Sequence, residues 1–375
     1  MRFIAAAAVF LFHVMFQLFF ANQDHQAKYS AIFGRSGYLG VGFFFILSGF
    51  VLTWSARSTD TTLRFWRRRF FKIYPNHLFT FLAAFILITQ VAGTVIDKKY
   101  ALLNLLLVQA WFPQFEINNS VNNISWSLSC EALFYLCFPL LIALVRRIRP
   151  ERLWAWAFVV LAGIFLVPSL SELLPYQPQL VWAPASENQF WFIYFFPPVR
   201  MLDFVLGIIV ARIVLAGRRL PLSLGGAVAL AVAAYAVGPL VLPGKYTLVA
   251  IMALPLALVI AAGATADVAG QATWLSSRAM VWLGEISFAF YLWHSMVITF
   301  GHRALGATRQ WGTPAAIGVI ALLFAVTLVL SWLLFSFWER PIMRRFAAPR
   351  RNPPAEPAPA TAAPAPPVPA GNAAQ

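Results

Sequence analysis

The chain has 375 residues, of which 61% are hydrophobic and 11% are charged. Charged residues this scarce exclude an ordinary soluble domain and predict an integral membrane protein. The formal net charge of +15 does not indicate a nucleic-acid partner. The basic residues stand in short clusters between apolar runs, where membrane topology explains them.

Apolar segments long enough to cross about 30 Å of hydrocarbon recur along the chain. They predict an all-α, polytopic membrane protein with about ten transmembrane helices, near residues 3–20, 38–56, 78–96, 126–147, 153–170, 197–215, 222–241, 245–263, 279–300 and 314–337. The apolar run at 101–112 is short, which favours an interfacial or half-buried helix. If Arg2 lies in the cytoplasm, 20 of the 28 lysines and arginines fall on cytoplasmic ends and 8 outside. The positive-inside rule then predicts that both termini are cytoplasmic.

Two ionisable side chains, Arg2 and His13, stand in the first apolar segment. Eleven residues at about 100° each place them within roughly 20° of each other on one helix face, roughly 16 Å apart along the axis. An ionisable group near the bilayer centre normally faces a bundle interior or a water-filled cavity, so it indicates a functional site. The alternative is that Arg2 is a cytoplasmic anchor and His13 a packing residue. A cleaved signal peptide is less favoured, because the run is long and residues 20–22 form a poor cleavage site.

An arginine and a histidine separated by ten residues on a first membrane helix resemble the acyltransferase-3 family of membrane-bound O-acyltransferases. Other segments resemble family motifs in the family's order: GVGFFFILSGF at 40–50, RRRFFKIYP at 67–75, WSLSCEALFY at 126–135, PVRMLDFVLG at 198–207, LGEISFAFYLWH at 283–294 and WERP at 338–341. The resemblance extends from Arg2 to about Phe346. One departure is that Met1 directly precedes Arg2, where family members usually carry a Leu-Asp-x-Leu lead.

The resemblance implies an enzyme that moves an acyl group, acetyl before others, from cytosolic acyl-CoA to a hydroxyl of an envelope, secreted or lipid-linked glycan. It implies a multi-pass protein of the bacterial inner membrane, with acyl-CoA as donor substrate, no bound cofactor and no metal. Other envelope-glycan assembly proteins are further expected partners. Within the family, acylation of a macrolide-like small molecule and transfer of succinyl are alternatives.

Two other classes of function stay open at this stage. A transporter of glycans or metabolites also buries ionisable residues in its helices, although no internal inverted repeat is apparent in this sequence. A non-catalytic membrane partner would make His13 dispensable.

The catalytic candidates are His13, Glu131 and Arg2. Acyl transfer to a hydroxyl needs a general base with a pKa near neutral, and imidazole is the obvious one. Of the five histidines, His25 and His302 are expected in outer loops and His77 at the cytoplasmic start of the third span. Only His13 and His294 are expected well inside the membrane, and His294 is either an orienting partner or catalytic. Glu131 is the candidate to orient the base and to stabilise its imidazolium, although an arginine such as Arg200 is an alternative partner for it.

The substrate-binding candidates are Arg67, Arg68, Arg69, Lys72, Trp126, Ser129, Arg200 and His294. The first four belong to a basic, aromatic segment at 57–72, expected as a cytoplasmic loop. It either lies on anionic headgroups or, as the resemblance implies, holds the phosphates of acyl-CoA. Trp126 and Ser129 have the alternative roles of interface anchor and helix cap. Arg200 stands three residues before Asp203, with which it can form a local ion pair.

The predicted domain organisation is simple. A transmembrane acyltransferase domain covers residues 1–346. The Ala/Pro-rich sequence at 347–375 predicts a disordered cytoplasmic tail.

Overall fold

The computed structural model describes residues 1–57, 60–271 and 273–347, so the predicted tail lies almost wholly outside the described residues. No β-strand forms within these ranges, which confirms the all-α prediction. The α-helices are α1 (Arg2–Val14), α2 (Gln23–Phe33), α3 (Ser36–Trp54), α4 (Thr62–Ile86), α5 (Lys98–Leu105), α6 (Phe115–Asn118), α7 (Trp126–Arg146), α8 (Leu153–Leu170), α9 (Glu187–Phe190), α10 (Pro197–Leu215), α11 (Leu224–Val241), α12 (Ala250–Val268), α13 (Arg278–Gly306), α14 (Thr313–Leu334) and α15 (Arg340–Ile342). Short π-helical turns at Leu87–Val91, Trp191–Phe195, Phe335–Glu339 and Met343–Ala347 extend or join them.

Eight helical stretches among the described residues are long and apolar enough to cross a membrane, which confirms a polytopic membrane protein. Each of the ten predicted spans corresponds to a described helix. Two of these ten helices are not among the eight long apolar stretches: α1, which is a shorter apolar helix, and α10, which carries charged residues. How many helices cross, and on which side the termini lie, stay predictions.

Helix α4 begins earlier than expected, so most of the segment predicted as a cytoplasmic loop is helical. The hydroxyl of Thr61 accepts a hydrogen bond from the backbone N–H of Arg64 at 3.4 Å and caps the helix start. The helix then continues through Pro75. His77, expected at the cytoplasmic start of a helix, therefore lies within α4 and is fully buried.

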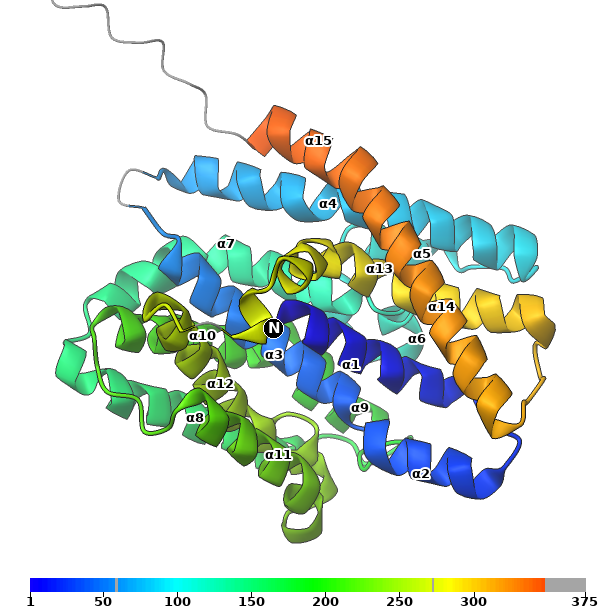
Figure 1. Ribbon diagram of the computed structural model, residues 1–375, viewed down its shortest axis with the longest axis horizontal. Helices are drawn as coiled ribbons and strands as arrows, with labels where there is room; N and C mark the ends of the chain where they lie inside the picture. The colour runs from blue at the N-terminus through cyan, green and yellow to red at the C-terminus, as the bar shows by residue number, and fades with distance from the viewer. Residues whose placement is uncertain (58–59, 272, 348–375) are drawn as a thin grey trace, which may run out of the picture.

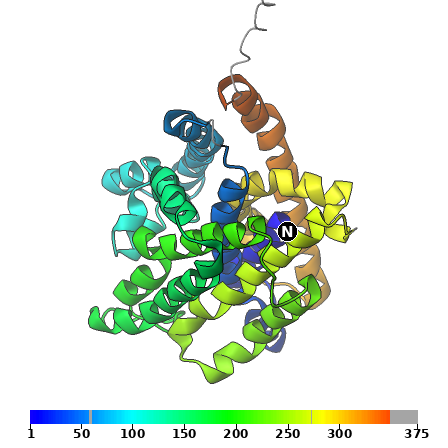
Figure 2. The same ribbon diagram turned by 90° about the vertical axis from the view of Figure 1, so that its left-hand side faces the viewer.

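Helices α1 and α3 lie at the centre of the bundle (Figures 1 and 2), where α1 contacts both α3 and α13, and α3 packs along α10. Glycines make the α3–α10 contact close. A Cβ on Gly49 would lie 2.0 Å from the carbonyl oxygen of Phe204, and a Cβ on Gly207 would lie 1.9 Å from that of Ile46. Small residues at such positions let two membrane helices approach backbone to backbone.

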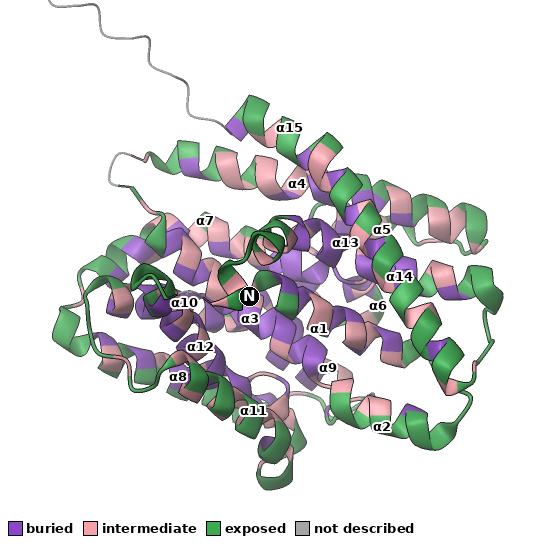
Figure 3. Cartoon of the chain, in the orientation of Figure 1, coloured by how far each residue is buried: buried purple, intermediate pink, exposed green. Residues whose placement is uncertain are grey.

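The burial of side chains agrees with this arrangement of helices (Figure 3). Buried residues gather on the central helices, and exposed residues lie on the outer faces of helices such as α11 and α14. Many exposed side chains are large and apolar, among them Leu240 on α11 and Leu322 on α14. Apolar outer faces suit a bundle whose surroundings are lipid rather than water.

The chain between α4 and α7 folds back into the protein through irregular backbone. Several of its polar side chains bond one another: the hydroxyl of Ser125 accepts from the amides of Asn104 at 3.0 Å and Gln109 at 3.1 Å. His77 Nε2 lies 3.1 Å from the carbonyl oxygen of Asn104. Non-helical backbone is tolerated within a membrane where protein surrounds it. This segment brings two asparagines, Asn119 and Asn123, to the site described below.

Candidate active site

Two histidines from opposite ends of the sequence meet inside the bundle. His294 Nε2 on α13 lies 3.1 Å from His13 Nδ1 on α1. His13 Nδ1 also lies 2.9 Å from the carbonyl oxygen of Val9, one turn earlier. His294 is completely buried, and its Nδ1 lies 2.5 Å from the carbonyl oxygen of Tyr291.

These contacts determine which ring nitrogens carry hydrogen. A carbonyl oxygen only accepts, so the Nδ1 atoms of His13 and His294 must both be donors. Neutral His294 then has a lone pair at Nε2, which accepts from the Nδ1–H that His13 shares with Val9. His13 is left with a lone pair at Nε2, where it can take a proton.

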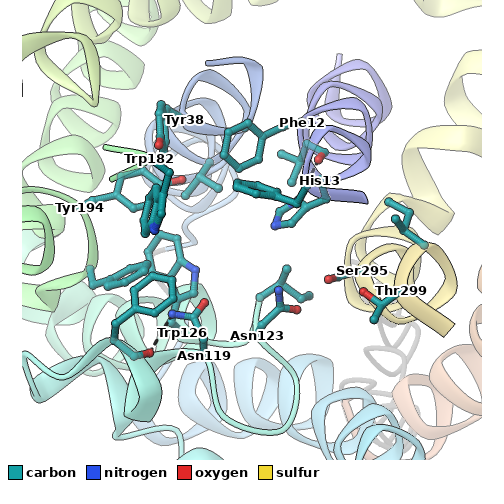
Figure 4. A pocket seen from close by; sticks show the side chains of 18 of the residues that line it. Phe12, His13, Tyr38, Asn119, Asn123, Trp126, Trp182, Tyr194, Ser295 and Thr299 are labelled. Atoms are coloured by element: carbon teal, nitrogen blue, oxygen red, sulfur yellow. Dashed lines mark hydrogen bonds between the residues drawn. The ribbon is translucent and has the colours of Figure 1, made fainter. Parts of the chain in front are cut away.

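His13 points into a pocket of about 360 Å³, which we call the histidine pocket (Figure 4). Aromatic side chains form much of its wall: Phe12, Phe16, Tyr38, Phe115, Trp126, Trp182, Phe190, Tyr194, Phe195 and Tyr291. Amides and hydroxyls line it as well: Gln17, Asn119, Asn123, Ser295 and Thr299. No Asp, Glu, Lys or Arg of the described chain lines it, so the pocket suits a neutral molecule that carries hydroxyl groups.

A second pocket, of about 140 Å³, lies at the other end of the same helices, and we call it the cationic pocket. Its charged lining residues are Arg2, Arg69, Lys72, Glu131 and Glu285. It opens at the end of α1 that carries Arg2, which is the end predicted to be cytoplasmic. Three of these five charged residues are basic, and guanidinium and ammonium groups can bind an anion.

The two pockets share Val41 and Tyr291, which stand between them. The Tyr291 hydroxyl donates to the carbonyl oxygen of Ile124 at 3.2 Å and lies 2.9 Å from the hydroxyl of Ser127. These bonds join α13 to the start of α7. Val41 and Tyr291 are thus the residues at which the two pockets adjoin.

Glu131, the candidate to orient His13 or to pair with an arginine such as Arg200, forms its hydrogen bond elsewhere. It lines the cationic pocket and accepts a hydrogen bond from Tyr135 at 3.1 Å. The side chain hydrogen-bonded to His13 is instead that of His294, whose role the sequence left open between orienting partner and catalyst. Arg2 lines the cationic pocket too, so Arg2 and His13 serve the two different pockets that α1 joins.

The four basic candidates on α4 separate into two pairs. Arg69 and Lys72 line the cationic pocket, whereas Arg67 and Arg68 do not. Arg68 forms an ion pair with Asp60, and this hydrogen-bonded guanidinium holds the pKa of the Asp60 carboxyl below its usual value.

Of the remaining candidates Trp126, Ser129 and Arg200, only Trp126 lines either of these two pockets: it is buried in the wall of the histidine pocket. Ser129 is buried on α7 and lines neither of the two pockets. Arg200 is also outside both and is almost completely buried, with its guanidinium 3.0 Å from Asp203 and stacked over Phe45. The local Arg200–Asp203 ion pair therefore forms.

Several pocket residues were not singled out from the sequence. Tyr291 stands three positions before His294, and that helical spacing from a membrane histidine was an available signal. Ser295 directly follows His294, so the same spacing does not apply to it. The asparagines Asn119 and Asn123 gave none, because they lie in irregular chain. His302 was expected in an outer loop, but it is a buried residue of α13, hydrogen-bonded to Gln17 at 3.1 Å.

Comparison with known proteins identifies acyltransferases as relatives of this chain. A family model described as an acyltransferase domain matches residues 1–336. The acyltransferase MdmB of Streptomyces mycarofaciens is 45% identical over 95% of this chain and 92% of its own length. The exopolysaccharide production protein ExoZ of Rhizobium meliloti is 28% identical over 87% of this chain and 96% of its own. The O-acetyltransferase OatA of Staphylococcus aureus is 25% identical over 82% of this chain and 53% of its own. No solved structure matches.

Proposed function

Because the chain belongs to the acyltransferase-3 family, we propose that it is an O-acyltransferase that moves an acyl group from cytosolic acyl-CoA to an acceptor hydroxyl. The observation that carries this proposal is the position of His13 Nε2, free to take a proton, on the wall of a neutral pocket that adjoins a cationic one. Family membership makes the protein an enzyme, which sets the transporter alternative aside.

We propose the cationic pocket as the donor site, because three of its five charged lining residues are basic. Arg2, Arg69 and Lys72 can bind the phosphates of coenzyme A, since guanidinium and ammonium groups are the usual phosphate ligands in proteins. The pocket is too small for a whole nucleotide, so the nucleotide stays at its mouth and the pantetheine arm enters. The arm carries the thioester toward Tyr291, where the pockets adjoin.

The reaction itself needs one base. His13 Nε2 takes the proton of the acceptor hydroxyl as its oxygen attacks the thioester carbonyl carbon. The carbon–sulfur bond then breaks, and the proton passes to the sulfur of coenzyme A, which leaves as the thiol. While His13 is an imidazolium, its Nδ1–H donates to the lone pair of neutral His294, which takes the place that a carboxylate has in many triads.

The acceptor is a neutral, hydroxylated compound. A glycan is the first candidate, because the apolar face of a sugar ring packs on Trp126 or Tyr194 while its hydroxyls reach amides such as Asn123. The second candidate is a small neutral molecule, favoured by the absence of charge from the described pocket wall and by its mostly aromatic surface. Acetyl is the proposed acyl group, and the bacterial inner membrane the proposed location.

Purified protein in lipid nanodiscs tests the proposal with labelled acetyl-CoA and matched acceptors. Transfer to a neutral oligosaccharide or a small neutral alcohol is expected, with little transfer to a uronic-acid oligosaccharide, and mass spectrometry identifies the ester. His13→Gln should lower the rate about 10²- to 10⁴-fold. His77→Gln is the matched control, since His77 is a buried histidine that lines neither pocket. No acetyl-CoA turnover by wild-type protein with any acceptor, or a wild-type rate for folded His13→Gln, would contradict the proposal.

A further inference from the structure

The family motif at 338–341 has no part in the reaction just described, yet it contains an almost completely buried acid. Glu339 ends the π-helical turn that follows α14, and its side chain is 2% exposed. A carboxylate inside a membrane protein is costly unless it is paired, so its partners indicate what it is for.

Both oxygens of Glu339 are held by α4. Oε1 accepts from the ammonium group of Lys72, and Oε2 accepts from the side-chain amide of Asn76 at 2.6 Å. Lys72 and Asn76 stand one helical turn apart, so they present their donors on one face of α4. The carboxylate bridges them.

Lys72 is also one of the three cations that line the cationic pocket, whereas Glu339 does not line it. The Lys72 ammonium lies 5.6 Å from the ring centre of Phe288, another residue of that pocket. A lysine side chain is long and flexible, and its ammonium has three N–H donors. The bond to Glu339 holds the side chain in place and leaves donors free for an anion.

The rest of the C-terminal segment packs along the same part of α4. The indole of Trp338 donates to the carbonyl oxygen of Pro75 at 3.1 Å. The rings of Phe71 and Phe346 stack with their centres 4.9 Å apart. These contacts on both sides of Glu339 in the chain hold its side chain in contact with α4.

We propose that Glu339 is a positioning residue for the donor site, which acts through Lys72 to place its ammonium for a phosphate group of acyl-CoA. This inference rests on the proposed function, because it needs the cationic pocket to be the donor site. It gives the C-terminal end of the domain a role in donor affinity and none in the chemistry at His13.

Steady-state kinetics with two donors test this role. Acetyl-CoA carries the nucleotide phosphates, whereas S-acetyl-pantetheine has the same thioester and none of them. Glu339→Gln should raise KM for acetyl-CoA about tenfold, while kcat, KM for the acceptor and the kinetics with acetyl-pantetheine change less than twofold. A general loss of structure would affect both donors alike, and that result would overturn the inference.

A double-mutant comparison tests whether Glu339 acts through Lys72. Lys72→Met should raise KM for acetyl-CoA as Glu339→Gln does, and the double variant should be no worse than either alone. Effects that multiply would overturn the inference, because Glu339 would then act independently of Lys72. If Glu339→Gln does not fold, Asn76→Ala, which releases only one carboxylate oxygen, carries the same donor comparison. Unchanged acetyl-CoA kinetics in Lys72→Met would instead refute the donor site itself, which separates the two failures.

Discussion

Replacing His294 by phenylalanine should slow acyl transfer by about 10- to 150-fold. The carbonyl of Val9 already accepts from His13 Nδ1–H at 2.9 Å, so the tautomer with a free Nε2 survives without His294. What is lost is the second acceptor for Nδ1–H, which matters most once His13 is an imidazolium. A hydrogen bond to a charged group contributes about 1.5–3 kcal/mol, and each 1.36 kcal/mol is a factor of about ten in rate.

His294→Gln is the matched variant, because an amide oxygen can accept from Nδ1–H as the imidazole does. It should be faster than His294→Phe. The measurement is kcat at saturating acetyl-CoA and acceptor, with the melting temperature of each variant recorded, since His294 is fully buried.

Two results would refute this reasoning. If folded His294→Phe loses as much activity as His13→Gln, then His294 is the base or an equal part of it. If the Gln and Phe variants are equally slow at equal stability, the hydrogen bond to His13 is not what His294 contributes.

Three more predictions test the architecture. Reporter fusions at Gly217 and at the C-terminus should both report the cytoplasm, and a periplasmic signal from either would contradict the charge-based topology. Arg69→Gln should raise KM for acetyl-CoA several-fold while Arg68→Gln leaves it near wild type, because only Arg69 lines the cationic pocket; equal effects would contradict the pocket assignment. Gly49→Ala should destabilise the fold by at least about 1–3 kcal/mol, because its Cβ would lie 2.0 Å from a carbonyl oxygen of α10; an unchanged melting temperature in detergent would disprove that close contact.

The sequence by itself determined those features that follow from composition and from the periodicity of single helices. The scarcity of charge and the long apolar runs predicted a polytopic helical protein, because an apolar run of that length crosses lipid as a helix that satisfies its own backbone hydrogen bonds. The spacing of Arg2 and His13 predicted one helix face, and the spacing of Arg200 and Asp203 an ion pair, which forms at 3.0 Å. Such inferences succeed because helix geometry is the same in every protein.

Only the tertiary structure decided which helix faces meet. His13 and His294 are 281 residues apart in the chain, and their contact depends on how α1 packs against α13. Arg68 and Arg69 could not be told apart in an expected loop, but on a helix successive side chains point about 100° apart, so one reaches Asp60 and the other the pocket. Glu131 was a reasonable partner for His13 by residue type. It faces the other pocket because the direction of a side chain between helices is set by the packing of the whole bundle.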